Sequence, residues 1–214
     1  PKAYCVLKGY PKSKYNSIVN KTPISFTTNR KIGGAAPFEY LSKIEEKYGV
    51  VDLVKAFMEI NDDEWTLELF GNGSSVNKIK ELSKKDPRVH LRGMAPNAQV
   101  LQEQKKVELL VNPRNDTQSF TKYSFPSKVI EYMGSGTPMI GYKLSGMPDE
   151  YKEYFYCVDN TGNGLYNTLK MAMELSTTER KEMGYRAQEF IVTKKTAVIQ
   201  CRKIVEMLKQ CLIK

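Results

Sequence analysis

The chain is poor in the residues that build metal sites and disulfides. Its 214 residues include one histidine, His90, and four cysteines, none of which stands in a Cys-x-x-Cys pair. No pattern typical of a zinc site is therefore present. Cys201 and Cys211 share one helical pattern, and their ten-residue spacing is too long for a disulfide between them. For these two and for Cys5 and Cys157 we expect reduced, buried thiols.

Long hydrophobic runs are also lacking. No apolar stretch approaches the ~20 residues that a membrane-spanning helix needs, and no signal-peptide pattern opens the chain. An apolar content of 41% over 214 residues is still enough for a sizeable core. The chain starts at Pro1 rather than at a methionine, so we expect a further segment upstream. These features predict a cytoplasmic protein whose membrane association is at most peripheral, at the inner face of the plasma membrane.

Acidic residues are missing from the first 38 positions, which hold seven lysines and arginines. Residues 194–214 hold six basic residues against one glutamate, so the net charge of +9 comes from the two ends of the chain. No zinc-finger spacing and no aromatic-rich RNA-binding signature accompanies this charge, so we expect no nucleic-acid partner. Basic ends can contact an anionic membrane or an anionic substrate, or they can simply be solvated.

From residue 37 onward, short apolar runs alternate with longer amphipathic segments. Strands are predicted at 38–41, 65–70, 89–91, 107–111, 138–141 and 155–158, and helices at 49–57, 76–82, 97–106, 126–134, 162–175, 177–191 and 195–212. This alternation predicts an α/β fold, a Rossmann-like doubly wound parallel sheet with helices on both faces. Ligands of such sheets bind beyond the carboxyl ends of the strands.

This pattern divides the chain into three parts. Residues 1–36 do not fit the alternation and are interpreted as a connector or the tail of a preceding domain. Residues 37–193 form the Rossmann-like domain. Residues 194–214 form a basic C-terminal helix.

The most informative segment runs from Thr121 to Pro138 and reads as a loop that enters a helix. Ser124 is a good N-cap, and Pro126 is tolerated in the first turn because its missing N–H would have no partner there. The unpaired N–H groups and the positive dipole end of this helix make a natural anion site at the ligand edge of the sheet.

Side chains of the same helix add to this site. Ser127 and Lys128 supply a hydroxyl and an ammonium group in the first turn. Glu131 lies one turn further, where a carboxylate can accept hydrogen bonds from two vicinal sugar hydroxyls. The alternative from the residues alone is an ordinary capped helix with a solvated Glu131.

The segment Lys128–Pro138 resembles the signature of family-four (group 1) glycosyltransferases of the GT-B fold, in their C-terminal nucleotide-sugar-binding domain. The Lys-Tyr-Ser-Phe-Pro-Ser-Lys sequence at 122–128 is closest to a bacterial subgroup active in capsular or exopolysaccharide assembly. Three further segments are similar to the first three strands of that domain and the turns after them: Phe38–Gly49, Leu67–Gly73 and Val89–Gly93.

The resemblance implies roles for individual residues. Lys43 stands where the family has the arginine that contacts the diphosphate, and Lys47 lies beside the family's lysine position, which is Tyr48 here. Glu131 matches the glutamate that holds the ribose hydroxyls, so Lys43, Lys47 and Glu131 are the catalytic candidates. Tyr123 replaces the glutamate that contacts the donor sugar; its hydroxyl, or Asp116, could substitute.

The remaining donor-binding candidates come from the turns of the family's pattern. Gly71 and Gly73 would let the backbone approach the nucleotide, and the backbone around Arg92, Gly93 and Met94 would read the base edge. The turn before the helix adds the candidates Tyr123, Ser124, Phe125, Ser127 and Lys128.

The activity implied is retaining transfer of a hexose from a UDP-sugar, without cofactor or metal. The N-terminus of the helix at 126–134, with Lys43, Lys47 and Lys128, would stabilise the departing diphosphate. A glycan or lipid-linked glycan acceptor would be bound by an N-terminal domain that this chain lacks, and the last helix would cross to that domain. We therefore expect these 214 residues to bind donor and to transfer nothing alone.

Two other functions are compatible with parts of the pattern. A Rossmann oxidoreductase or epimerase would also bind a nucleotide, but Ser42-Lys43-Ile44 stands where a Gly-x-Gly-x-x-Gly turn should follow the first strand. A non-catalytic basic module would bind nucleic acid or anionic membrane through its charged ends, with a steep salt dependence and no response to UDP.

Overall fold

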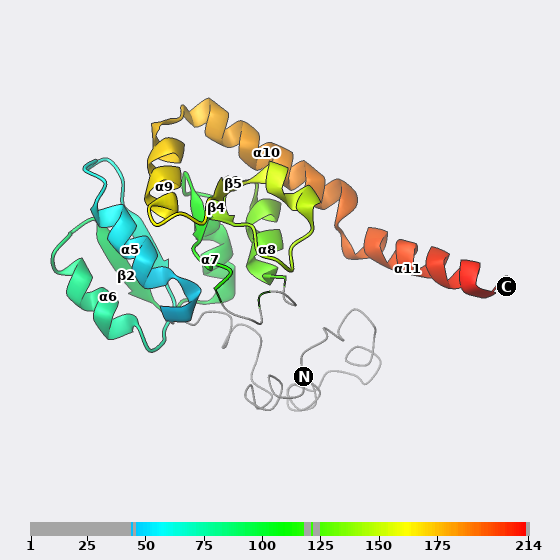
Figure 1. The fold of residues 1–214 in the computed structure, drawn as a ribbon, viewed down its shortest axis with the longest axis horizontal. Helices are drawn as coiled ribbons and strands as arrows, with labels where there is room; N and C mark the ends of the chain where they lie inside the picture. Colours follow the sequence, from blue (N-terminus) through cyan, green and yellow to red (C-terminus); the bar gives the residue numbers. More distant parts are fainter. Residues whose placement is uncertain (1–43, 45, 118–120, 122–124, 213–214) are drawn as a thin grey trace. The chain divides into compact units, whose positions relative to one another are not determined.

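The computed structural model describes residues 44, 46–117, 121 and 125–212 (Figure 1). The chain divides into two units, Pro1–Lys43 and Ile44–Lys214. The predicted connector at 1–36 and the predicted strand at 38–41 lie outside the described residues. All of the described residues belong to the second unit.

Helices and strands alternate along this unit as predicted. The elements are η2 (Glu46–Tyr48), α5 (Val50–Met58), β1 (Leu67–Phe70), α6 (Val76–Ser83), β2 (Val89–Gly93), α7 (Asn97–Gln104), β3 (Leu110–Asn112), α8 (Ser127–Ser135), β4 (Met139–Tyr142), η4 (Asp149–Tyr154), β5 (Tyr156–Val158), α9 (Gly164–Glu174), α10 (Thr177–Lys194) and α11 (Ala197–Leu212). The third of these strands is shorter than the predicted 107–111 and shifted toward its carboxyl end.

All strand pairs among the described residues are parallel. β1 pairs with β2, with Leu67 opposite Val89, and β3, β4 and β5 follow one another in that order. The prediction of parallel pairing is confirmed. The described strands form two sheets rather than one, because no hydrogen-bonded ladder joins β1–β2 to β3–β5 among them.

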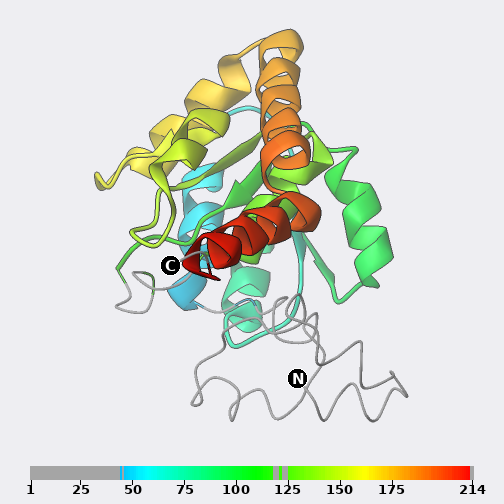
Figure 2. The same cartoon turned by 90° about the vertical axis from the view of Figure 1, so that its right-hand side faces the viewer.

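Helices cover both faces of the strands, as a doubly wound fold requires. Successive residues of β4 show this: Met139 packs in a core with α8, η4 and α10, whereas Ile140 packs in a core with α5, α6 and α9. Since neighbouring side chains on a strand point to opposite faces, both faces of β4 are buried. Figures 1 and 2 show α8 and α10 together on one side.

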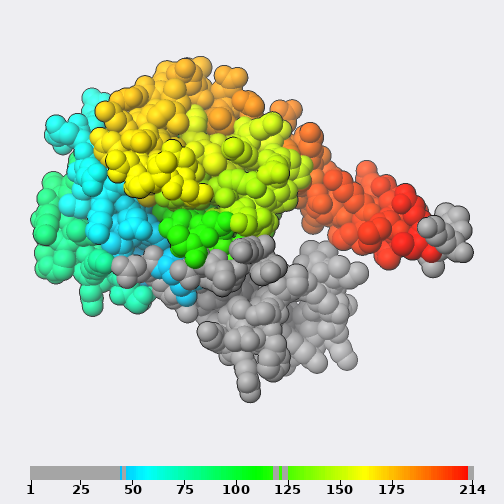
Figure 3. Space-filling view, in the orientation of Figure 1, coloured from blue at the N-terminus to red at the C-terminus, as the bar shows by residue number. Residues whose placement is uncertain are grey.

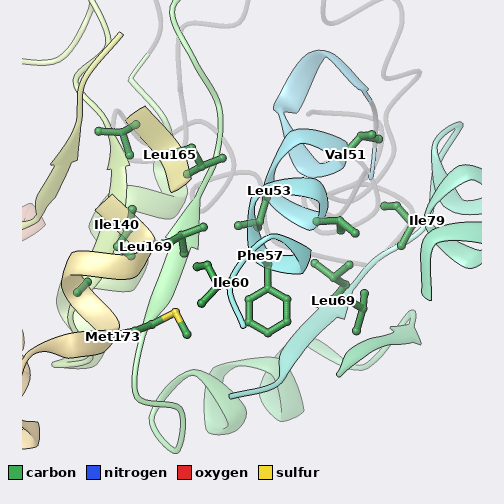
Figure 4. Packing of buried hydrophobic residues seen from close by; sticks show 14 of the residues in the cluster. Val51, Leu53, Phe57, Ile60, Leu69, Ile79, Ile140, Leu165, Leu169 and Met173 are labelled. Carbon is green, nitrogen blue, oxygen red and sulfur yellow. The ribbon is translucent and has the colours of Figure 1, made fainter. Parts of the chain in front are cut away.

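The core around α5 follows from a simple helical spacing. Leu53, Val54 and Phe57 recur at intervals of three and four, and all three are buried. Figure 4 shows Phe57 between Leu69 of β1 and Leu169 of α9. One apolar helix face therefore ties both sheets to a single core.

A close approach between backbones fixes α10 on α8. A Cβ atom on Gly184 would lie 2.1 Å from the carbonyl oxygen of Gly136, so only glycine allows this distance. Gln188 adds a hydrogen bond of 3.1 Å from its Nε2 to the carbonyl of Gly134. The position of α8 is thus set from its C-terminal end, which leaves its N-terminus at the carboxyl edge of the strands.

The last helix, α11, has an exposed apolar side. Val198, Ile204, Val205, Met207 and Leu208 are 41–69% exposed, and the helix extends away from the strands (Figures 1 and 3). Among the described residues, no helix is long and apolar enough to cross a membrane.

The cysteines agree with the sequence prediction in part. Cys157, Cys201 and Cys211 are free thiols. The expectation of burial is wrong for all three: Cys157 and Cys201 are partly exposed, and Cys211 is exposed because α11 does not pack its apolar side against the domain. Cys5 lies outside the described residues.

Candidate functional site

Two glycines join the carboxyl ends of β1 and β2. The backbone N–H of Gly71 donates to the carbonyl of Gly93 at 2.8 Å. Both have positive φ angles, 138° at Gly71 and 72° at Gly93, which glycine adopts without strain. A Cβ on Gly93 would meet no atom within 4 Å, and Met94 after it is 51% exposed. This corner of the strand edge is therefore open to a ligand.

The turn after β1 packs tightly on the backbone of Ile44. Ile44 donates its N–H to Asn72 O at 2.8 Å, and its carbonyl accepts from the Ser75 N–H at 3.1 Å. A Cβ on Gly73 would lie 2.4 Å from the Ile44 oxygen. Gly73 thus brings two backbone segments together, and the predicted approach of this turn to the nucleotide stays a prediction.

The start of α5 meets the loop after β3. Gly49 has a φ of 73°, and a Cβ there would lie 2.1 Å from the carbonyl oxygen of Pro113. The next residue, Arg114, places its guanidinium 5.7 Å from the ring centroid of Tyr48, and Lys47 places its ammonium 5.1 Å from the same ring. Two cations therefore flank one aromatic ring at the carboxyl edge.

Arg114 is a further candidate at this edge, and no sequence motif indicated it. It is half-buried, and burial lowers the pKa of its guanidinium below the usual value, although an arginine stays protonated at neutral pH. The available signal was its position directly after a strand, at the edge where ligands of parallel sheets bind. Lys47, which was predicted, is exposed in the same region.

Asp116 connects the loop after β3 to the loop after β4. Its Oδ2 accepts hydrogen bonds from the N–H of Ser145, at 3.1 Å, and from the Ser145 hydroxyl. A second link joins the Gly146 N–H to the carbonyl of Thr121 at 3.2 Å. The structure therefore gives Asp116, which was considered as a sugar contact, a role in holding two loops of the carboxyl edge together.

α8 begins later than predicted. Its N-cap is Pro126, which offers no side-chain cap, and its first residue is Ser127. The prediction that Ser124 caps this helix is wrong, because the cap position is held by Pro126, two positions further along the chain. The first amides of a helix have no acceptor within the helix. The cap residue Pro126 offers them no side-chain acceptor, so the N–H groups of Ser127 and Lys128 are candidates for binding an anion.

The other predicted residues of this segment differ in their surroundings. The ring of Phe125 packs 4.8 Å from that of Tyr151, in the core under α8, so it supports the helix start. Glu131 is exposed on the second turn, where its Oε1 accepts a hydrogen bond of 2.7 Å from Nε2 of Gln104. Lys43, Tyr123 and Ser124 lie outside the described residues.

The side chain of Arg92 points to a neighbouring strand. Its Nε donates to Glu68 at 2.5 Å, and Nδ1 of His90 lies 2.6 Å from the same carboxylate. Glu68 and His90 are directly opposite in the β1–β2 register. Burial alone would raise the pKa of Glu68, but the hydrogen bonds from Arg92 and His90 outweigh it and hold this pKa below its usual value. Only the backbone of Arg92 is left for the predicted base contact.

The interactions of Glu68 with Arg92 and His90 predict a pH-dependent contribution to stability. Because the folded-state pKa of Glu68 is depressed, its contribution is present above the unfolded-state pKa of about 4.3 and is lost as the pH falls through the folded-state value. We expect Glu68→Gln to lower the free energy of unfolding at pH 7 by about 0.5 to 1 kcal/mol. The difference from the wild type should shrink at pH 3.

Urea unfolding at the two pH values measures this difference. Glu81→Gln is the matched control, because Glu81 pairs with Lys84 on an exposed helix surface, and its effect should be smaller. An equal loss at pH 7 and pH 3 in Glu68→Gln would contradict the assignment.

A pocket of about 580 Å³ opens between α5, α9 and the loops after β3 and β5, and the predicted candidate Asp116 is part of its lining. Its lining is polar and includes Asp52, Lys55, Tyr142 and Tyr166. Burial raises the pKa of Tyr142, with nearby Asp52 and Asp159 adding to the effect, so its hydroxyl stays protonated. The carboxylates in this lining make the pocket unsuited to a diphosphate.

Comparisons with known proteins agree with this geometry. Residues 38–172, more than half of the chain, match the family described as glycosyl transferases group 1. No curated protein matches the chain significantly.

Solved structures share the fold at low sequence identity. The C-terminal domain of a glycosyl transferase group 1 family protein (LpcC) from Francisella tularensis has a TM-score of 0.58 at 16% identity, covering 72% of this chain and 83% of that one. Alr3699/HepE from Anabaena, in complex with UDP, has a TM-score of 0.64 at 18% identity, covering 79% and 47%. Sucrose-phosphate synthase from Thermosynechococcus elongatus has a TM-score of 0.62 at 17% identity, covering 79% and 43%.

The match thus spans about half the length of the two larger proteins. Its α/β fold, with parallel strands covered on both faces, is that of the Rossmann-like C-terminal domain of GT-B glycosyltransferases. With the family match over residues 38–172, the chain belongs to the group 1 glycosyltransferases.

Proposed function

We propose that this chain is the donor-binding domain of a retaining hexosyltransferase that uses a UDP-sugar in bacterial surface polysaccharide synthesis. The observation that carries the proposal is the start of α8 at the carboxyl edge, where the cap residue Pro126 provides no side-chain acceptor and Glu131 lies one turn further. Structures of the similar HepE contain UDP and UDP-glucose, and that of the pneumococcal O-GlcNAc transferase GtfA contains UDP and GlcNAc. Uracil is therefore the base we propose for the donor.

In this proposal, fixed positive charge stabilises the diphosphate as it leaves the sugar. The first N–H groups of α8 and the ammonium of Lys128 receive the growing negative charge of the leaving group. Lys47 in η2 and Arg114 in the loop after β3 add positive charge. The same role is proposed for Lys43, which lies outside the described residues. Glu131 holds the ribose hydroxyls and so fixes the donor along the helix.

The site is proposed to work without a metal ion. Among the described residues, no group of three or more histidine, cysteine, aspartate or glutamate side chains is arranged to hold one. We expect UDP affinity to be the same, within about twofold, in EDTA and in excess Mg²⁺, because helix dipole and basic side chains neutralise the phosphates. Calorimetry in the two buffers checks this, and loss of UDP binding in EDTA would contradict it.

Specificity for the nucleotide is the direct test of the proposed function. In calorimetry with UDP, GDP and NAD, we expect UDP to bind at least about tenfold more tightly than NAD, a difference of about 1.4 kcal/mol. Equal or tighter NAD binding would favour an oxidoreductase or epimerase. Indifference to all three, together with salt-sensitive DNA or vesicle binding, would favour a basic binding module.

The acceptor is proposed to bind elsewhere. We propose that an N-terminal domain supplies the glycan or lipid-linked glycan acceptor site, since the match spans about half the length of HepE. These 214 residues should then bind donor but show no transfer in a turnover assay. Full transfer activity from this chain alone would contradict the proposal that another domain binds the acceptor.

We further propose that the protein is cytoplasmic and that α11 contacts the anionic inner face of the membrane. Arg202, Lys203 and Lys209 flank its exposed apolar side, the arrangement of a helix that lies in the membrane interface. Leu208→Glu should abolish sedimentation with phosphatidylglycerol vesicles, while Gln210→Glu, with the same charge change on the polar side, should not. If wild-type protein stays in the supernatant, the apolar side is instead free to pack on the proposed N-terminal domain.

A further inference from the structure

Gln104 stands out among the buried polar residues near the site. It is the last residue of α7, and only 6% of its surface is exposed. Its main-chain carbonyl accepts a hydrogen bond from the Thr137 hydroxyl at 2.6 Å, which anchors it next to the start of β4. Its side-chain Nε2 donates to Oε1 of Glu131 at 2.7 Å. A fixed, buried amide therefore holds an exposed carboxylate.

The amide makes this contact in only one orientation. Nε2 is the donor of the group and a carboxylate accepts only, so the reversed amide would set two acceptors against each other. In the observed orientation, Oε1 of Gln104 is buried without a hydrogen-bond partner. A methionine would fill a similar volume without an unpaired carbonyl, so stability alone does not account for this glutamine.

We propose that Gln104 is a positioning residue, which holds Glu131 in the rotamer that receives the ribose hydroxyls of the donor. This inference rests on the proposed function, in which Glu131 binds the ribose. The hydrogen bond occupies one lone pair of Oε1 and leaves Oε2 free for hydroxyl donors. An exposed glutamate otherwise samples several rotamers, and fixing one before binding reduces the entropy lost when the ligand binds.

The test measures the affinities of the wild type and of Gln104→Met for UDP and for 2′-deoxy-UDP. We expect Gln104→Met to weaken UDP binding about three- to tenfold, the range expected for one immobilised side chain. Binding of 2′-deoxy-UDP, which lacks one of the two hydroxyls, should weaken less, so the preference for UDP over the deoxy ligand should shrink. A purely structural role would weaken both ligands by the same factor and would overturn the inference.

A measurement on the unmodified protein covers the case in which Gln104→Met does not fold. The side-chain NH₂ resonances of Gln104 should shift when UDP is added and should shift less with 2′-deoxy-UDP. Unchanged resonances at saturating UDP would overturn the inference. Absence of UDP binding altogether would instead contradict the proposed function, so the two failures are distinguishable.

Discussion

Glu131→Ala is expected to weaken UDP binding about 30-fold or more, which corresponds to about 2 kcal/mol of binding free energy. Hydrogen bonds to a charged group are worth about 1.5 to 3 kcal/mol each, and the carboxylate is proposed to accept two from the ribose. The substitution also leaves the buried Nε2 of Gln104 without its acceptor. Calorimetric titration of both proteins with UDP measures the difference.

Two controls separate binding from folding in this experiment. Glu153→Ala removes an exposed carboxylate from η4, away from α8, and should leave UDP affinity unchanged. Thermal unfolding without ligand measures separately the loss of stability that is expected in Glu131→Ala when the buried amide of Gln104 loses its acceptor. If UDP stabilises both proteins equally, the assignment of the ribose to Glu131 is wrong.

Arg180→Met is expected to lower the free energy of unfolding by about 3 kcal/mol, the largest effect on stability that we predict. Arg180 is 6% exposed at the start of α10. Its Nη1 donates to the carbonyls of Met173, at 3.2 Å, and Leu175, which end α9. Without the guanidinium, these carbonyls lose their donor and the dipole of α9 loses a cation at its C-terminus.

Further contacts of Arg180 add to this expected loss. Its Nη2 lies 3.0 Å from Oε2 of Glu108, and its guanidinium lies 5.0 Å from the ring centroid of Trp65. Methionine keeps much of the side-chain volume, so the change tests the polar contacts rather than a cavity. Urea unfolding is the measurement, with Arg186→Met on the exposed side of α10 as the matched control. Equal stability of the two variants would contradict the account.

The sequence predicted the elements well where one local periodicity decides them. The spacing of Leu53, Val54 and Phe57 predicts the buried face of α5. The start of α8 was predicted too early, because Ser124 is a good cap by type and Pro126 has no capping side chain. Local sequence preference alone could not decide whether Ser124 or Pro126 is the N-cap residue.

Contacts between distant residues could not be predicted from the sequence. The pairing of Arg92 with Glu68 depends on the register of β1 against β2, which periodicity does not fix. The approach of Arg114 to Tyr48 depends on how Gly49 meets Pro113, and the bond from Gln104 to Glu131 depends on the packing of α7 on α8. The sequence thus indicated the ligand edge and Glu131 but not the residues that support them.

The central claim is that the donor diphosphate binds at the N-terminus of α8. Amide NMR of the chain during titration with UDP tests this most directly. We expect the largest shifts at the backbone N–H groups of Ser127 and Lys128, with smaller ones at Gly93 and Met94. Shifts confined to the pocket between α5 and α9, or to the basic ends of the chain, would contradict the claim.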